Sequence, residues 1–152
     1  MKQIIDSLKK LSNSYKLLAE NANHIFNTLK IRDYKRKEVL ENEAQELYKL
    51  KEKYEAEFIT LIVKKADEMD LAEKKLQKIL DVHKNEVEVL EAQYEIERLF
   101  EYTQSFQINL KRNIEFAKAF VQVNEKAEEI MFEAIRRERY KQGGSLLLNE
   151  EL

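Results

Sequence analysis

The chain contains no proline, and its only two glycines, Gly143 and Gly144, are adjacent near the end of its 152 residues. Proline removes a backbone donor and clashes inside a helix, and each internal glycine costs a helix about 1 kcal/mol relative to alanine. A chain that lacks both residues from Met1 to Gln142 is therefore expected to be helical almost throughout. The predicted fold class is all-α.

Further absences exclude several kinds of chemistry. Without cysteine the chain has no disulfides, no thiolate catalysis and no cysteine-based zinc site. The first residues lack the apolar core of a secretory signal. The longest apolar cluster, residues 58–63, is too short to span a bilayer. We therefore expect a cytoplasmic protein with no membrane span.

The charge balance bears on the class of partner. Charged residues make up 37% of the chain and apolar residues 43%, and the net charge is −2. Many charges are typical of long amphipathic helices, and the near-neutral balance argues against specific nucleic-acid binding. Lys35, Arg36 and Lys37 form a short basic triplet, which we interpret as a solvated helix start or an internal ion-pair partner.

Apolar residues recur at helical spacing along the whole chain. The first segment alternates steps of four and three, which is a heptad pattern on one helical face. Polar stretches at residues 30–37, 64–70 and 102–105 interrupt the pattern and leave four segments of similar length. This pattern predicts an antiparallel bundle of three or four long amphipathic helices, with a two-helix coiled-coil hairpin turning near residues 67–70 as the alternative. The first heptad positions are Ile4, Leu8, Leu11, Tyr15, Leu18, Ala22, Ile25 and Leu29.

Several residues resemble helix ends. Asp70 and Glu73 have the spacing of a capping box, and Thr103 or Ser105 is a possible cap after the third interruption. Cations precede Gly143, a common pattern at the last turn of a helix. The predicted organisation is a single helical domain over residues 1–142 and a flexible C-terminal tail over residues 143–152.

No catalytic, metal or cofactor site is predicted. Di-iron bundles use Glu-x-x-His pairs, and neither His24 nor His83 has a glutamate three residues before it. Nucleophile elbows and glycine-rich phosphate loops are absent. His83 lies in an apolar stripe and is interpreted as a core or core-edge histidine. Asn124 lies on a seam of the last helix, where a polar residue either fixes register or marks the core margin. We expect no enzyme, no cofactor and no small-molecule substrate.

The last helical run and the tail favour interaction. The run is apolar on more than one face, so either one core absorbs it or a second stripe binds another helix. One stripe contains Phe116, Phe120, Val123 and Ile130, and the other contains Ala117, Val121, Met131 and Ile135. The predicted partner-binding residues are Phe116, Phe120, Val123, Ile130, Phe132, Leu146, Leu147 and Leu148.

The predicted function is a non-catalytic helical interaction protein, an adaptor or chaperone-like module that binds a protein partner through an apolar helical face. In size and helicity alone the chain resembles small helical export chaperones of flagellar or injectisome systems, which implies capture of a partner protein. One alternative is a structural coiled coil made of several copies of the chain. The other is an inhibitor that occludes the surface of another protein.

Overall fold

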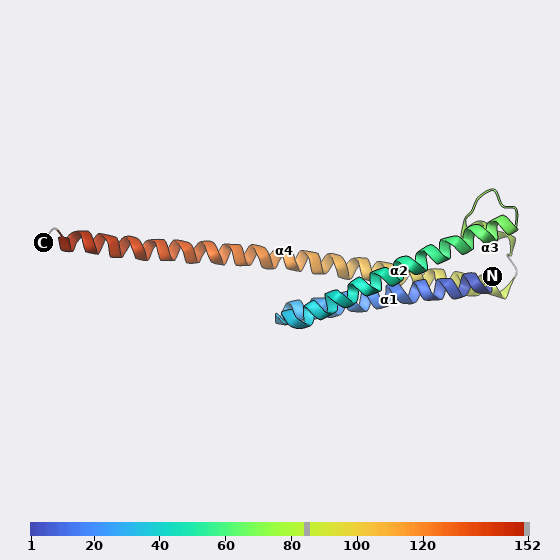
Figure 1. The fold of residues 1–152 in the computed structure, drawn as a ribbon, viewed down its shortest axis with the longest axis horizontal. Coiled ribbons are helices and arrows are strands. Elements are labelled where there is room, and N and C mark those ends of the chain that lie inside the picture. Colours follow the sequence, from blue (N-terminus) through green and yellow to red (C-terminus); the bar gives the residue numbers. More distant parts are fainter. Residues whose placement is uncertain (84–85, 151–152) are drawn as a thin grey trace. The chain divides into compact units, whose positions relative to one another are not determined.

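The computed structural model describes the backbone of residues 1–83 and 86–150, and the side chains of these residues as far as Lys141. Within that part of the chain the secondary structure is α1 (Lys2–Ile31), α2 (Tyr34–Glu68), α3 (Leu76–Val82) and α4 (Val87–Glu150), with no strand (Figure 1). The all-α prediction is confirmed. The chain divides into two units, residues 1–113 and residues 114–152.

In the first unit the chain reverses direction at Arg32 and Asp33. Arg32 takes a left-handed conformation, with φ 58°, and the N–H of Asp33 donates to the main-chain oxygen of Thr28 at 3.0 Å. The Asp33 carboxylate then accepts from the N–H of Arg36 at 3.1 Å and caps α2. α2 returns along α1 in the antiparallel direction (Figure 1). The alternative hairpin with one turn near residues 67–70 is therefore wrong.

A second reversal follows α2. Asp70 is left-handed, with φ 54°, and the N–H of Leu71 donates to Ala66 oxygen at 2.9 Å. No glycine is available here, and aspartate tolerates this conformation better than most residues. The capping box predicted at Asp70 and Glu73 is wrong, because α3 begins at Leu76 with Lys75 as its N-cap.

Two clusters of buried side chains form the core of the first unit. The larger cluster gathers residues of all four helices, and α3 contributes Ile79, which is fully buried. In the smaller cluster the ring of Phe106 meets Tyr15 and Tyr48 edge-on, with centroids 6.3 and 5.8 Å apart. Each long helix therefore contributes to both clusters. The larger cluster contains Ile4, Ile5, Leu8, Ile62, Ala66, Ile79, Leu80, Val89 and Ala92.

Polar contacts join α1 to the part of α4 that lies in the first unit. Lys9 Nζ lies 2.6 Å from Glu91 Oε1, and Asn109 Nδ2 donates to Ala19 oxygen at 3.1 Å. Residue numbers increase together on both helices, so α1 and α4 run parallel while α2 runs antiparallel to α1. The first unit is a three-helix up-down-up bundle, in agreement with the predicted bundle, with α3 as a short additional helix.

The third predicted interruption, residues 102–105, is wrong. α4 continues through it, and Thr103 Oγ1 donates to Leu99 oxygen one turn earlier at 2.7 Å. Neither Thr103 nor Ser105 begins a helix, and four helices of similar length do not form. A hydroxyl that bonds within its own helix needs no break in that helix.

α4 also runs beyond Gly143, as far as Glu150. The helix end predicted at Gly143 is therefore wrong. Two adjacent glycines cost roughly 2 kcal/mol and reduce helix stability without blocking its geometry, as a proline would. The flexibility expected of residues 143–152 stays a prediction.

Candidate partner-binding surface

The second unit is the C-terminal part of one helix, and it carries large apolar side chains on its surface. Val123 is 65% exposed, Ile130 60% and Met131 63%. Leu8, by comparison, is 1% exposed in the core of the first unit. Burial of such side chains is the main source of affinity between helices in water. This segment is the strongest candidate for a binding surface among the side chains that the structure describes.

The heptad register of α4 shows which positions form this surface. In the first unit the inward positions of α4 alternate in steps of three and four, from Val89 and Ala92 to Phe106 and Asn113. The same steps continue through the second unit and fall mainly on small residues. These central positions are Ala117, Phe120, Asn124, Ala127, Met131 and Ala134.

Larger apolar residues lie on both sides of this central line. Val123 and Ile130 flank it on one side, and Val121 and Ile135 flank it on the other. We call these residues together the 116–135 face. Its members are Phe116, Ala117, Phe120, Val121, Val123, Asn124, Ala127, Ile130, Met131, Ala134 and Ile135.

The predicted partner-binding residues have several locations. Val123 and Ile130 are exposed on the 116–135 face, whereas Phe116 and Phe120 are half-buried on it. Phe132 is 65% exposed and lies just beyond Val121 around the helix, at the edge of the face. Leu146, Leu147 and Leu148 have their backbone in α4, and their side chains lie outside the described residues.

Charge along the second unit is divided by sign. Residues 125–133 contain four acidic residues and one basic residue, a net charge of −3. Residues 136–141 contain four basic residues and one acidic residue, a net charge of +3. One ion pair crosses the boundary within the helix, between Arg137 Nη2 and Glu133 Oε1 at 2.9 Å. The remaining charges are on exposed positions where a partner can reach them.

Asn124 and His83 are two polar residues that the sequence pattern placed on apolar stripes. Asn124 is exposed rather than at the margin of a core. His83 is the C-cap of α3, so the helical stripe expected to run from Leu80 to Val87 is interrupted there, and its side chain is partly buried. Its Nδ1 lies 2.9 Å from Glu86 Oε1, and its Nε2 is buried with no hydrogen-bond partner among the described residues. Residues 84 and 85, which directly follow it, lie outside the described residues, so we assign His83 no function.

The asparagines of α4 in the first unit have a structural role that the sequence analysis did not identify. Asn113 Nδ2 donates to Ala22 oxygen at 2.7 Å. Beside it, Arg112 Nη2 donates to Asn23 Oδ1 at 2.9 Å, and the guanidinium lies 3.8 Å from the ring centre of Phe26. The four-residue spacing of Asn109 and Asn113 places both on one helical face, and that spacing is the signal that could have identified them.

Two further clusters of charge are structural. Glu95 is 3% exposed, and Arg98 lies 3.5 Å from its carboxylate while stacking on Tyr94 and Tyr102. The hydrogen bond to the Tyr102 hydroxyl raises the pKa of Arg98, so its charge is permanent. This arrangement is an ion pair at the edge of a bundle.

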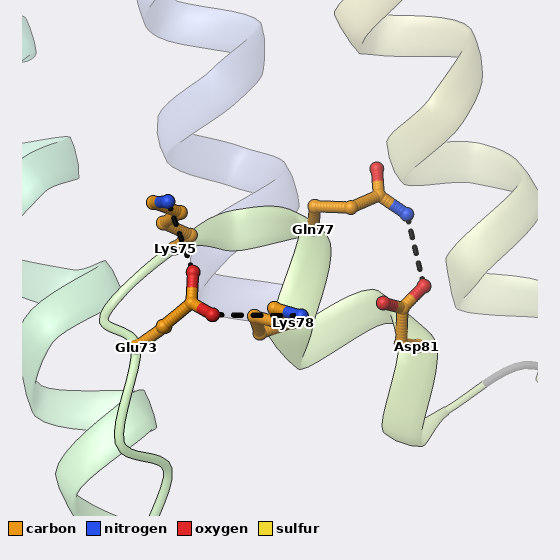
Figure 2. A network of polar contacts seen from close by, with 5 residues as sticks. All are labelled: Glu73, Lys75, Gln77, Lys78 and Asp81. Carbon is orange, nitrogen blue, oxygen red and sulfur yellow. Dashed lines mark hydrogen bonds and ion pairs between the residues drawn. The ribbon is translucent and has the colours of Figure 1, made fainter.

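The second cluster surrounds the start of α3 (Figure 2). Glu73 accepts from Lys75 Nζ at 2.9 Å and lies 3.7 Å from Lys78 Nζ, while Gln77 Nε2 donates to Asp81 Oδ1 at 3.0 Å. The bond from Lys75, and then the charge of Lys78, lower the pKa of the Glu73 carboxyl. Since α3 begins with no side-chain cap, these contacts help to hold the preceding loop against its first turn.

Over residues 1–83 and 86–141, no group of three or more histidine, aspartate or glutamate side chains is placed to hold a metal ion. In the same part of the chain, none of the helices combines the length and the apolar character needed to cross a bilayer. Comparisons with protein-family models, with curated proteins and with solved structures give no significant match to this chain.

Proposed function

We propose that this chain is a non-catalytic interaction protein that binds a protein partner through the 116–135 face. In this proposal residues 1–113 form a stable bundle, and the helical segment beyond residue 113 recognises the partner. The supporting observation is the exposure of Val123, Ile130 and Met131 on a unit in which none of the described side chains, residues 114–141, is buried. The function is adaptor-like or chaperone-like, because the predicted surface binds another helix and holds no reactive group.

The size of the surface is suitable for helix recognition. From residue 116 to residue 135 the face extends about 30 Å, at 1.5 Å per residue. Helix-binding proteins use anchors spaced three, four and seven residues apart, and Val123, Ala127 and Ile130 follow one another at steps of four and three. A central line with three alanines leaves room for a partner backbone to approach closely, and the larger residues beside it cover the partner from both sides.

The test uses the full chain with Val123→Glu and Ile130→Glu combined. The matched control is Gln122→Glu, which introduces a negative charge at an exposed position on the opposite side of the helix from Met131. We expect all variants to keep the helical circular dichroism and the thermal unfolding of the natural chain. The double variant should lose proteins that co-purify with the tagged natural chain from its native cell, and the control should retain them.

Two results would contradict this proposal. Retention of every co-purifying protein by the double variant would show that the face is not the binding surface. Unfolding of the double variant, with normal folding of the control, would show that Val123 and Ile130 belong to a core.

A further inference from the structure

We propose that the 116–135 face is covered by the same face of a second copy of this chain, with the two α4 segments antiparallel. This inference rests on the proposed function, because it names the partner of the same surface. It combines the shape of the face with the distribution of charge along residues 125–141.

The distribution of charge selects the direction. In a parallel pair, residues 125–133 of both copies lie side by side, and two segments with a net charge of −3 repel each other. The basic residues 136–141 repel in the same way. In an antiparallel pair centred near residue 133, each acidic segment lies along the basic segment of the other copy. The charge pattern is therefore complementary to itself in one direction only.

The heptad positions agree with this register. A two-fold axis that places Met131 of one copy beside Ala134 of the other also places Ala127 beside Glu138. Each of these pairs joins one large side chain to an alanine, which lets the two helices approach closely. A symmetric contact uses the same patch on both copies, so one surface serves both sides.

The length of the helix is sufficient for such a pair. In this register the backbone of residues 142–150 of one copy runs along residues 115–123 of the other, so the helices overlap over residues 115–150. This overlap is about five heptads, which exceeds the three to four that a coiled-coil assignment requires. The continuation of α4 beyond the glycine pair is therefore part of the proposed contact.

Single cysteines in the full chain provide the direct test, because the natural sequence contains no cysteine. Ala127→Cys and Glu138→Cys are prepared separately, and both positions are exposed. After mixing and mild oxidation we expect a disulfide between the two different variants, and little cross-linking of either variant with itself. Cross-linking of each variant with itself would overturn the antiparallel arrangement in favour of a parallel one.

Charge reversal provides a second readout that does not depend on cysteine. Reversing Arg136, Arg137 and Arg139 to glutamate should raise the dimer dissociation constant by at least roughly tenfold. Reversing Glu125, Glu128 and Glu129 to lysine as well restores complementarity in the antiparallel pair, so this six-residue variant should dimerise again. Failure of the six-residue variant to recover, while it folds normally, would overturn the assigned direction.

Light scattering on the natural chain separates this inference from the proposed function. We expect a mass of twice 18.2 kDa that decreases on dilution. A monomer at every concentration would overturn the inference. In that case the proposed function still stands if Val123→Glu with Ile130→Glu removes a co-purifying protein, and it fails if those substitutions change nothing.

Discussion

Asn113 in α4 donates its side-chain amide to the main-chain oxygen of Ala22 in α1, with 2.7 Å between nitrogen and oxygen. One turn earlier, Asn109 makes the same kind of bond to Ala19, at 3.1 Å. Both carbonyls belong to a helix, so each amide uses the second lone pair of an oxygen inside α1. These bonds fix the position of α4 along α1, because a shift of one residue would separate each asparagine amide from its carbonyl oxygen.

Replacing Asn113 by alanine should lower the free energy of unfolding by about 1–2 kcal/mol. The substitution removes a hydrogen bond at a position that is 8% exposed. Chemical denaturation monitored by circular dichroism measures the change. Asn42→Ala is the matched control, because Asn42 is exposed on α2, and it should be neutral or slightly stabilising. Equal effects of both substitutions would show that the bond to Ala22 adds nothing to stability.

Phe106→Ala should destabilise the first unit by about 3–4 kcal/mol, since it leaves a cavity where three helices meet. The Phe106 ring contacts Tyr15 of α1 and Tyr48 of α2, so its loss weakens the packing of α4 against both of these helices. Phe132→Ala makes the same chemical change at a position that is 65% exposed. Thermal unfolding should separate the two variants by many degrees, and a similar loss in both would place Phe132 in a core.

Arg32→Gly should stabilise the protein by about 0.5–1 kcal/mol. Arg32 is left-handed at φ 58°, where a side chain costs roughly 1–2 kcal/mol, and the extra entropy of unfolded glycine offsets part of the gain. Lys64→Gly removes the same charge from the exposed face of α2 and should cost about 1 kcal/mol. Denaturant midpoints for the two variants should therefore move in opposite directions. A decrease for Arg32→Gly would contradict the turn described here.

The side-chain carboxyl of Glu73 should titrate at lower pH than an ordinary glutamate, because Lys75 and Lys78 stabilise its charged form. The folded pKa lies below the unfolded one. The charged Glu73 carboxyl therefore stabilises the fold at pH values above its unfolded pKa. This contribution is lost as the pH falls through its lower, folded pKa. Carbon-13 NMR of the carboxyl measures the midpoint directly. Lys75→Met and Lys78→Met should each raise that midpoint (Figure 2), and an unchanged midpoint in both variants would contradict the pairing.

Much of the first unit could be predicted from the sequence. The heptad positions Leu8, Leu11 and Leu18 are buried, because an amphipathic helix in water must cover its apolar side. The positions of the turns were harder to predict. Thr103 resembled a cap and instead bonds inside α4, and Asp70 resembled a cap and instead takes a left-handed conformation just after the end of α2. The Thr103 hydroxyl can make either kind of bond, and the packing of the neighbouring helices determines which one forms.

The binding surface was predicted only in part. Val123 and Ile130 were recognised as one apolar stripe and Met131 as part of another, and the register of α4 places all three on one face. The pattern could not show whether a core absorbs that face, because periodicity identifies the side of a helix to be buried without identifying its partner. The exposure of these residues supports the interaction proposal, and it follows from three-dimensional structure alone.

The absence of proline, and of glycine before residue 143, determined helix almost throughout, because backbone geometry depends on local residue type. The choice of neighbours was decided only in three dimensions. Asn113 reaches Ala22 from a distance of 91 residues along the chain, and Phe106 joins Tyr15 to Tyr48. Such contacts depend on where each helix ends and on which others lie beside it. A heptad pattern contains neither piece of information, since many arrangements of helices bury the same stripe.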